Sequence, residues 1–234
     1  MPECAIILYI CLGVRVMRKI VSFLLVVVMV LSLSGCSSRY PKIEKKVIAA
    51  AESCCGAEEA DKKQRKMIIG ATANLNDPEF SDGVYFTISK DEVDDISFGL
   101  ITFDPDYIKQ MLFFVKSEDS SSYLITLVFD MRTKSAAEDV YDYCYDDMGI
   151  TKKELKAEAK RYGAEYGIME EKNEFAVIMV SKKENQARGV YIKRAGTAVI
   201  ACNYQGSTTG DLYEEFLDFS NEAGFVDMEA LLGE

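Results

Sequence analysis

The sequence contains no histidine, no tryptophan and only four prolines among its 234 residues. Without histidine, the chain cannot hold a Ser-His-Asp or Cys-His catalytic arrangement, nor a metal or haem site with an imidazole ligand. Its seven cysteines include no CxxC pair, and the nucleophile motifs GxSxG and SxxK are missing. These absences remove many of the common classes of enzyme and metal protein.

Positive charge is scarce relative to negative charge. The 27 lysines and arginines face 38 aspartates and glutamates, which gives a formal charge of −11. A nucleic-acid partner needs a basic surface that displaces counterions from the phosphates, so we exclude nucleic acid as a partner. The apolar fraction of 49% is that of a globular protein rather than a disordered one.

The N-terminal region has the pattern of a secretory signal peptide. Arg18 and Lys19 precede a largely apolar run of 14 residues over 20–33. A membrane-spanning helix needs about 20 apolar residues, so this run is short for a permanent anchor and typical of a signal peptide. The alternative is an uncleaved transmembrane anchor. Because Met17 stands directly before Arg18, we expect translation to begin there and residues 1–16 not to be translated.

The run ends in Leu33-Ser34-Gly35-Cys36, and here the sequence resembles bacterial membrane lipoproteins. In that family an apolar residue and two small residues precede the modified cysteine and form the lipobox. The resemblance implies a diacylglyceryl group on the Cys36 sulfur, with fatty acyl chains such as palmitate, and cleavage between Gly35 and Cys36. Two acyl chains hold a protein durably on a membrane. The implied location is therefore the extracytoplasmic face of the bacterial cell membrane, with lipid attachment at Cys36.

We expect three parts in the chain: a signal peptide over 1–35, a lipid-anchored tether over 36–41 and a single domain over 42–234. Loss of 1–35 removes three basic residues and one acid, so the mature chain keeps 24 basic and 37 acidic residues and a charge of −13. An anionic membrane surface repels such a domain, which should stand off the lipid.

Hydrophobic spacing and turn residues predict a mixture of helices and strands. Helices are expected at 41–55, 57–69, 135–149, 151–162 and 209–223. Strands are expected at 84–89, 107–116, 123–131, 165–170, 175–182, 189–194 and 198–204. Three segments fit the capping box that starts a helix, namely Ser89–Glu92, Ser135–Glu138 and Thr151–Glu154.

The order of these elements predicts an α+β fold, with a mainly antiparallel sheet and helices packed on one face, preceded by a signal-peptide helix. The strand over 123–131 is almost continuously apolar, which is typical of a central strand covered on both sides. A hairpin followed by a helix occurs twice, over 107–148 and 189–223. In pattern, the mature chain is similar to uncharacterised small α+β lipoproteins of Gram-positive bacteria, a resemblance that implies no activity.

Four cysteines remain once Cys36 is lipidated: Cys54, Cys55, Cys144 and Cys202. Disulfides are stable outside the cell, and the predicted packing of a helix on the sheet makes Cys144 and Cys202 candidates for one. Cys54 and Cys55 are adjacent and cannot readily pair without backbone strain. The alternative is that these cysteines are small buried residues with free thiols.

Carboxylates are the only abundant acid–base groups, and no pattern among them assigns a catalytic residue, a cofactor or a metal. They gather in Asp91–Asp95, around Pro105 at Asp104 and Asp106, and in Asp142–Asp147. EF-hand spacing is absent, so we interpret these groups as solvated surfaces.

Two further features have a plain structural interpretation. The loop Gly206–Gly210 lacks the GK[ST] ending of a phosphate loop, and we expect Thr208 or Thr209 to cap the following helix. Tyr143 and Tyr145 are expected to point away from the apolar stripe of their helix, where tyrosines suit a protein-contact patch or pack against neighbouring loops.

The sequence thus favours a non-enzymatic binding or structural module of the cell envelope. Its expected partners are the membrane, through the lipid on Cys36, and a protein or cell-wall component. The alternatives are a hydrolase that uses carboxylates or Ser and Lys, and a lipoprotein that binds a small ligand. The last is weakened by length, because the 199 residues of the mature chain are few for a two-lobed solute receptor.

The expected start at Met17 can be tested on a Cys36→Ala variant. Because lipidation precedes cleavage in lipoproteins, this variant should accumulate as an uncut precursor. N-terminal sequencing of the precursor should begin at Met17, whereas a start at Met1 would contradict the expectation.

Overall fold

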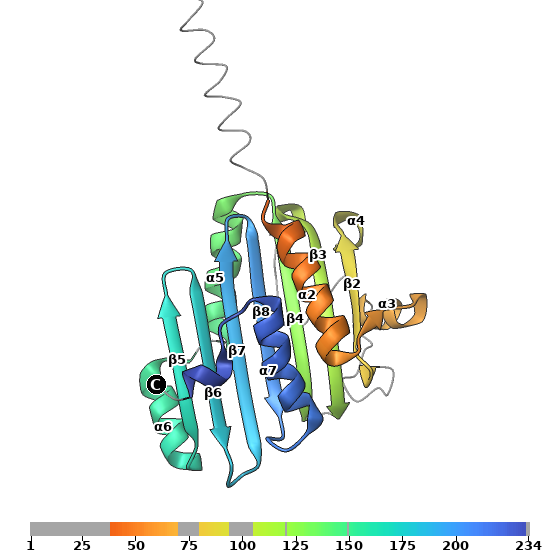
Figure 1. The fold of residues 1–234 in the computed structure, drawn as a ribbon. Coiled ribbons are helices and arrows are strands. Elements are labelled where there is room, and N and C mark those ends of the chain that lie inside the picture. Colours follow the sequence, from red (N-terminus) through yellow and green to blue (C-terminus); the bar gives the residue numbers. More distant parts are fainter. Residues whose placement is uncertain (1–37, 70–79, 94–104, 120, 149, 233–234) are drawn as a thin grey trace, which may run out of the picture. The chain divides into compact units, whose positions relative to one another are not determined.

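A computed structural model describes residues 38–69, 80–93, 105–119, 121–148 and 150–232 (Figure 1). The predicted signal peptide, the lipobox and Cys36 lie outside the described residues. Residues Ser38–Glu234 form one structural unit, which contains all the described residues. Within these residues, no helix is long and apolar enough to cross a membrane.

A single sheet organises this unit, and its described strands follow the order β1-β2-β3-β4-β8-β7-β6-β5. All neighbours are antiparallel except β1 and β2, which run parallel. The strands are β1 (Glu58–Glu59), β2 (Val84–Ser89), β3 (Ile108–Asp119), β4 (Ser122–Met131), β5 (Glu165–Glu171), β6 (Glu174–Ser181), β7 (Gln186–Ala195) and β8 (Ala198–Gly206). The α+β class and the mainly antiparallel sheet are therefore confirmed.

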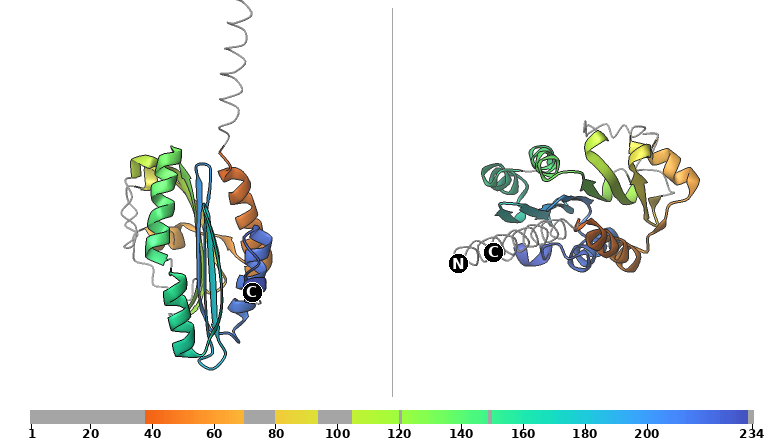
Figure 2. Two further views of the ribbon diagram at one scale, coloured as in Figure 1. Left: turned by 90° about the vertical axis from the view of Figure 1, so that its left-hand side faces the viewer. Right: turned by 90° about the horizontal axis from the view of Figure 1, so that it is seen from above.

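Helices cover both faces of the sheet, so the prediction that they pack on one face is wrong. The helices are α2 (Tyr40–Cys55), α3 (Lys62–Ile69), α4 (Lys90–Val93), α5 (Lys134–Met148), α6 (Lys152–Tyr162), α7 (Asp211–Ala223) and α8 (Met228–Leu231), with a 3₁₀ turn η2 at Pro105–Tyr107. Figure 2 shows α5 and α6 on one side of the sheet and α2 and α7 on the other. We call these sides the α5/α6 face and the α2/α7 face. The two hairpin-and-helix units therefore place their helices, α5 and α7, on opposite faces.

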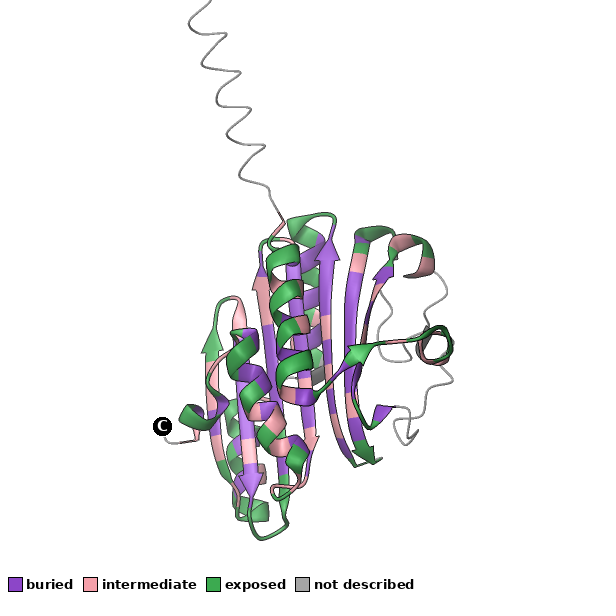
Figure 3. Cartoon of the chain, turned by 45° about the vertical axis from the view of Figure 1, so that its right-hand side comes forward, coloured by how far each residue is buried: buried purple, intermediate pink, exposed green. Residues whose placement is uncertain are grey.

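Two hydrophobic cores follow from this arrangement, one on each face. Side chains alternate along a strand, so β4 gives Leu124 and Val128 to the core under α2 and α7, and Phe129 to the core under α5. Figure 3 shows buried residues concentrated along the central strands and exposed residues on the outer sides of the helices. In a strand that is apolar at successive positions, side chains on both faces must be buried, and this requires helices on both sides of the sheet.

Helix α2 starts closer to the lipobox than the expected tether boundary at residue 41. Tyr40 is fully buried, and its hydroxyl donates to Glu44 Oε1 at 2.9 Å. Pro41 occupies the first turn, where no amide hydrogen is needed, and Gly56 ends the helix in the left-handed conformation at φ +64°. The folded unit consequently begins within a few residues of Cys36.

Of the three expected capping boxes, one is complete and one is half formed. Thr151 and Glu154 form a complete box at the start of α6, and Glu92 accepts hydrogen bonds from the backbone and hydroxyl of Ser89. The box expected at Ser135–Glu138 is wrong. There the cap is Thr133, whose Oγ1 accepts from the Ala136 amide at 3.1 Å, so the helix begins earlier.

The packing of α7 against β7 can be tested at Gly189, where only a hydrogen fits. A Cβ there would overlap the Cζ atom of Phe216 and lie 2.7 Å from its Cε1, and the Phe216 ring is fully buried. Gly189→Ala should therefore lower the free energy of unfolding by about 1–3 kcal/mol, as overpacked cores do.

Two further variants serve as controls for Gly189→Ala: the single variant Phe216→Leu and the double variant that carries both substitutions. The free energy of unfolding of all three is measured by urea denaturation. Because leucine vacates the clash, the double variant should be more stable than the sum of the two single effects, by about 1 kcal/mol or more. Strict additivity would contradict the described contact.

Candidate functional site

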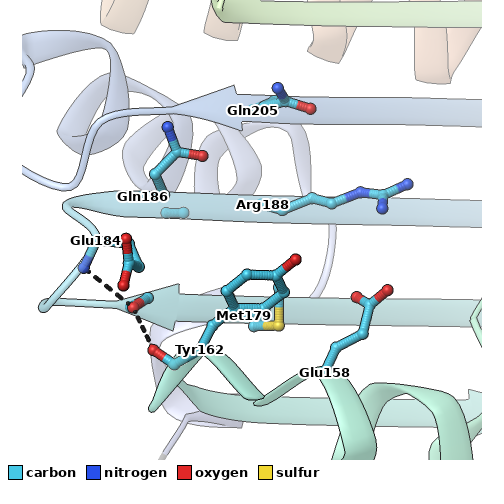
Figure 4. Close-up of a pocket in the computed structure, with 9 residues that line it drawn as sticks. Glu158, Tyr162, Met179, Glu184, Gln186, Arg188 and Gln205 are labelled. Carbon is cyan, nitrogen blue, oxygen red and sulfur yellow. Dashed lines mark hydrogen bonds between the residues drawn. The ribbon is translucent and has the colours of Figure 1, made fainter. Parts of the chain in front are cut away.

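One cavity lies on the α5/α6 face, where α6 meets the ends of β6, β7 and β8 (Figure 4). Its volume is about 360 Å³. Strands β6, β7 and β8 form its floor, with Met179, Arg188 and Gln205 side by side in register. Helix α6 supplies one wall through Glu158 and Tyr162. We call this cavity the α6 pocket.

One buried hydroxyl holds the rim of the α6 pocket together. Ser181 Oγ donates to the carbonyl oxygen of Tyr162 at 2.9 Å and accepts from the amide of Glu184 at 3.2 Å. It thereby joins the end of α6 to the turn between β6 and β7. Helix α6 stops here because Gly163 adopts the left-handed conformation at φ +60°, which glycine enters without a Cβ penalty.

The charged groups of the α6 pocket are Arg188 on the floor, Glu158 on the wall and Glu184 on the turn. Among the described residues, Arg188 and Glu158 take part in no salt bridge. Figure 4 shows these two side chains reaching toward the same end of the pocket, with Glu184 and Gln186 at the other end and the Tyr162 ring between. The pocket therefore holds opposite charges that face open space instead of each other.

The polar floor continues one row along β8. Asn203 lies on the same face as Gln205, and its Oδ1 is buried without a hydrogen-bond partner among the described residues. Toward the start of α6, the apolar residues Leu155, Val177 and Val190 border a narrow crease, which shares Glu158, Met179 and Arg188 with the pocket. The site thus passes from a polar floor to an apolar edge.

A second cavity, beside the end of α2, is rich in carboxylates, and its one amine is already paired. Lys116 Nζ donates to Glu215 Oε1 at 2.8 Å and to the carbonyl oxygen of Cys55 at 2.9 Å. Most of the Lys116 side chain is buried, with 13% exposed. Within the described residues, no group of three or more Cys, Asp or Glu side chains is arranged to hold a metal ion. We interpret Lys116 as a structural tie between β3, α2 and α7.

The candidate disulfide between Cys144 and Cys202 is not formed, and the prediction is wrong. Cys144 belongs to the core on the α5/α6 face and Cys202 to the core on the α2/α7 face, so the sheet itself separates them. None of the four described cysteines forms a disulfide. Burial raises the pKa of Cys202 to about 12 and also raises the pKa values of Cys55 and Cys54, which keeps these thiols protonated and lowers their reactivity.

The described carboxylates of the three acidic clusters lie at the surface, and Glu92 among them has a structural role. Asp106, Asp142 and Asp146 are exposed, and Asp94, Asp95 and Asp104 lie outside the described residues. The pKa of Glu92 is lowered, first by the hydrogen bond from the Ser89 backbone and also by Arg65, whose guanidinium lies 2.7 Å from Glu92 Oε1. This carboxylate caps α4 and ties it to α3.

Two further sequence interpretations are corrected by the structure. Thr208 and Thr209 do not cap α7, because their hydroxyls donate to Asn185 Oδ1. The side chain that caps the start of α7 is Glu118, whose Oε1 accepts a hydrogen bond from the Leu212 amide at 3.2 Å. Tyr145 does not point outward. Its ring packs edge-on against Phe175 at 5.0 Å, and its hydroxyl donates to Glu170, so it helps to seat α5 on the sheet.

No protein-family model matches the chain, and no curated protein matches it. Among solved structures, it is similar to the extracellular domain of PknH from Mycobacterium tuberculosis, with 12% identical residues and a TM-score of 0.29. That match covers 59% of this chain and 77% of the other. A likeness of this size does not establish a shared fold and carries no functional conclusion.

The residues of the α6 pocket were not singled out by sequence reasoning. Their signal is the break in apolar alternation along β7, where Gln186 and Arg188 occupy the face that Val190 and Ile192 continue into the core. A polar pair at the end of an otherwise buried strand face marks the place where the helical cover ends.

The absence of disulfides among the four described cysteines can be tested by alkylation with iodoacetamide, in native protein and in denaturant. Under native conditions Cys55, Cys144 and Cys202 should stay unlabelled because they are buried, while the half-buried Cys54 reacts slowly. In denaturant without reductant, all four should be labelled, as mapped by peptide mass. A Cys144–Cys202 pair that is labelled only after reduction would restore the disulfide and contradict the structure.

Proposed function

We propose that the chain is a lipid-anchored, extracytoplasmic binding module of the cell envelope, and that the α6 pocket receives its ligand. The lipid anchor is supported by the lipobox residues 33–36 together with the short apolar run before them. The pocket is the observation that carries the binding role, because polar and charged side chains from α6, β6, β7 and β8 converge on one concavity of about 360 Å³.

The position of the pocket in the fold suits a protein tethered through Cys36. Ser38, two residues further along the chain, donates to Asp130 Oδ1 at 2.9 Å and contacts Thr197, at the end of the sheet where β7 turns into β8. The α6 pocket lies at the other end of β7. Ten residues of antiparallel strand span about 30 Å, so the pocket lies far from Ser38, the first described residue.

The chemistry of the pocket favours binding over hydrolysis. A serine nucleophile needs a base that accepts its proton, but the Ser181 hydroxyl donates to a backbone carbonyl and accepts from a backbone amide. Arg188, Gln186 and Gln205 are instead groups that recognise ligands through directed hydrogen bonds. Of the alternatives considered from the sequence, the lipoprotein that binds a small ligand is the one that this geometry supports.

Lipidation can be tested by growing cells that express the chain with labelled palmitate. The wild type and a Cys54→Ser control should incorporate the label, while Cys36→Ser should not, because only residue 36 follows the lipobox. Mass analysis of the wild type should find a lipid-modified Cys36 as the N-terminal residue. An unmodified Cys36 with residues 20–35 still attached would contradict the proposal.

A further inference from the structure

From the arrangement of charges in the α6 pocket, we infer that its ligand is a free α-amino acid with a cationic side chain, such as lysine. This inference rests on the proposed binding function and adds the chemical class of the ligand. Three features carry it: an arginine without an ion partner among the described residues, two glutamates at different places around the pocket, and an open concavity of about 360 Å³, which is the size of one small molecule.

Arg188 is placed to bind a carboxylate. Its backbone is fixed in the middle of the floor by pairing with β6 and β8, and its side chain forms no salt bridge with any described residue. A guanidinium presents a planar fork of donors that matches the two oxygens of a carboxylate. Gln205, its register partner on β8, adds an amide next to the same position.

Glu158 is placed to bind the α-ammonium group of the same molecule. It lines the pocket from α6 and reaches toward the end of the pocket that Arg188 also approaches (Figure 4). The two side chains do not close on each other as a salt bridge, although their charges are opposite. An α-amino acid carries its carboxylate and ammonium on one carbon, so it can satisfy both residues at this end.

The other end of the pocket favours a second positive charge. Glu184 and Gln186 lie there, beyond the ring of Tyr162, and the neighbouring Lys183 stays 3.7 Å from Glu184 in a solvent-exposed pair. Exposed pairs of this kind are weak and separate readily. With one arginine and two glutamates, the pocket is complementary to a ligand that has one carboxylate and two ammonium groups.

Size and net charge agree with this class of ligand. The volume of about 360 Å³ is near the lower limit for small-molecule pockets, ~300 Å³, which suits a single amino acid. Met179 and Tyr162 supply apolar surface for the methylene groups of a lysine side chain. The formal charge of −11 repels phosphorylated or polycarboxylate ligands and attracts a cationic one.

The test is calorimetric titration of the full chain, purified in detergent, with L-lysine and three analogues. Nα-acetyl-lysine lacks the α-ammonium, lysinamide lacks the carboxylate, and norleucine lacks the side-chain ammonium. We expect lysine to bind and each analogue to bind about tenfold more weakly or worse, because each analogue loses the charge-assisted hydrogen bonds that one of its charged groups would form in the pocket. Absence of lysine binding, or equal binding of lysine and any one analogue, would overturn the assignment.

Matched variants connect the binding to the named residues. Arg188→Gln and Glu158→Gln should each weaken lysine binding about tenfold or more, whereas Arg132→Gln and Glu214→Gln, exposed residues outside the pocket, should leave it unchanged. Arg188→Lys keeps the charge but not the fork, and should bind with intermediate affinity even if Arg188→Gln unfolds. Unchanged affinity in folded Arg188→Gln would overturn the assignment.

The failure of this inference is distinguishable from failure of the proposed function. The titration uses purified protein and does not depend on lipidation, which the palmitate experiment measures separately. If Cys36 is lipidated but lysine does not bind, the ligand class is wrong, while the lipid-anchored location stands.

Discussion

The structure depends on one constraint: strands that are apolar on both faces must be covered on both faces. In β4 the residues Leu124, Val128 and Phe129 are all buried, and they belong to two different cores. The neighbouring β8 behaves in the same way, with Ile200 in one core and Val199 in the other. Burial of apolar surface stabilises the fold by about 25 cal/mol per Å². Both faces of these strands contribute this stabilisation only if helices cover both faces of the sheet. The antiparallel pairing of β4 with β8 joins the two hairpin units into one sheet, so both cores are built on the two faces of the same pair of strands.

The candidate site is the place where this double cover ends. On the α5/α6 face, α5 covers the middle of the sheet and α6 its end, and α6 stops at Tyr162 because Gly163 turns the chain. Beyond that point the floor carries Arg188 and Gln205 in place of aliphatic residues. The backbones of both residues are hydrogen-bonded within the sheet, so their polar side chains extend from a rigid surface rather than from a loop. On the other face, α7 and α8 keep the same strands covered, which lets one face serve binding while the other supplies stability.

The sequence predicted the strands and the long helices because their signals are local. Apolar runs bounded by turn residues identified β3 to β8, and Thr151 with Glu154 marked the start of α6. Which face a helix covers is not a local property, and the prediction of a one-sided sheet failed although the continuously apolar β4 already required two sides. The Cys144–Cys202 pairing failed for the same reason. Strand β1 consists of two exposed glutamates that pair with β2. It has no apolar residues, so no pattern of hydrophobic residues in the sequence predicts it. The pocket residues come from four elements and converge only in the folded chain.

Hydrogen exchange measured peptide by peptide tests the double-covered sheet most directly. If one sheet with β4 and β8 at its centre carries both cores, the amides of 122–131 and 198–206 should exchange most slowly, and α2 and α7 should lose protection together with them in a single cooperative unit. If instead β1 to β4 and β5 to β8 exchanged as two separate units, with protection lost first between β4 and β8, the two halves of the sheet would be independent, and a single sheet carrying both cores would be contradicted.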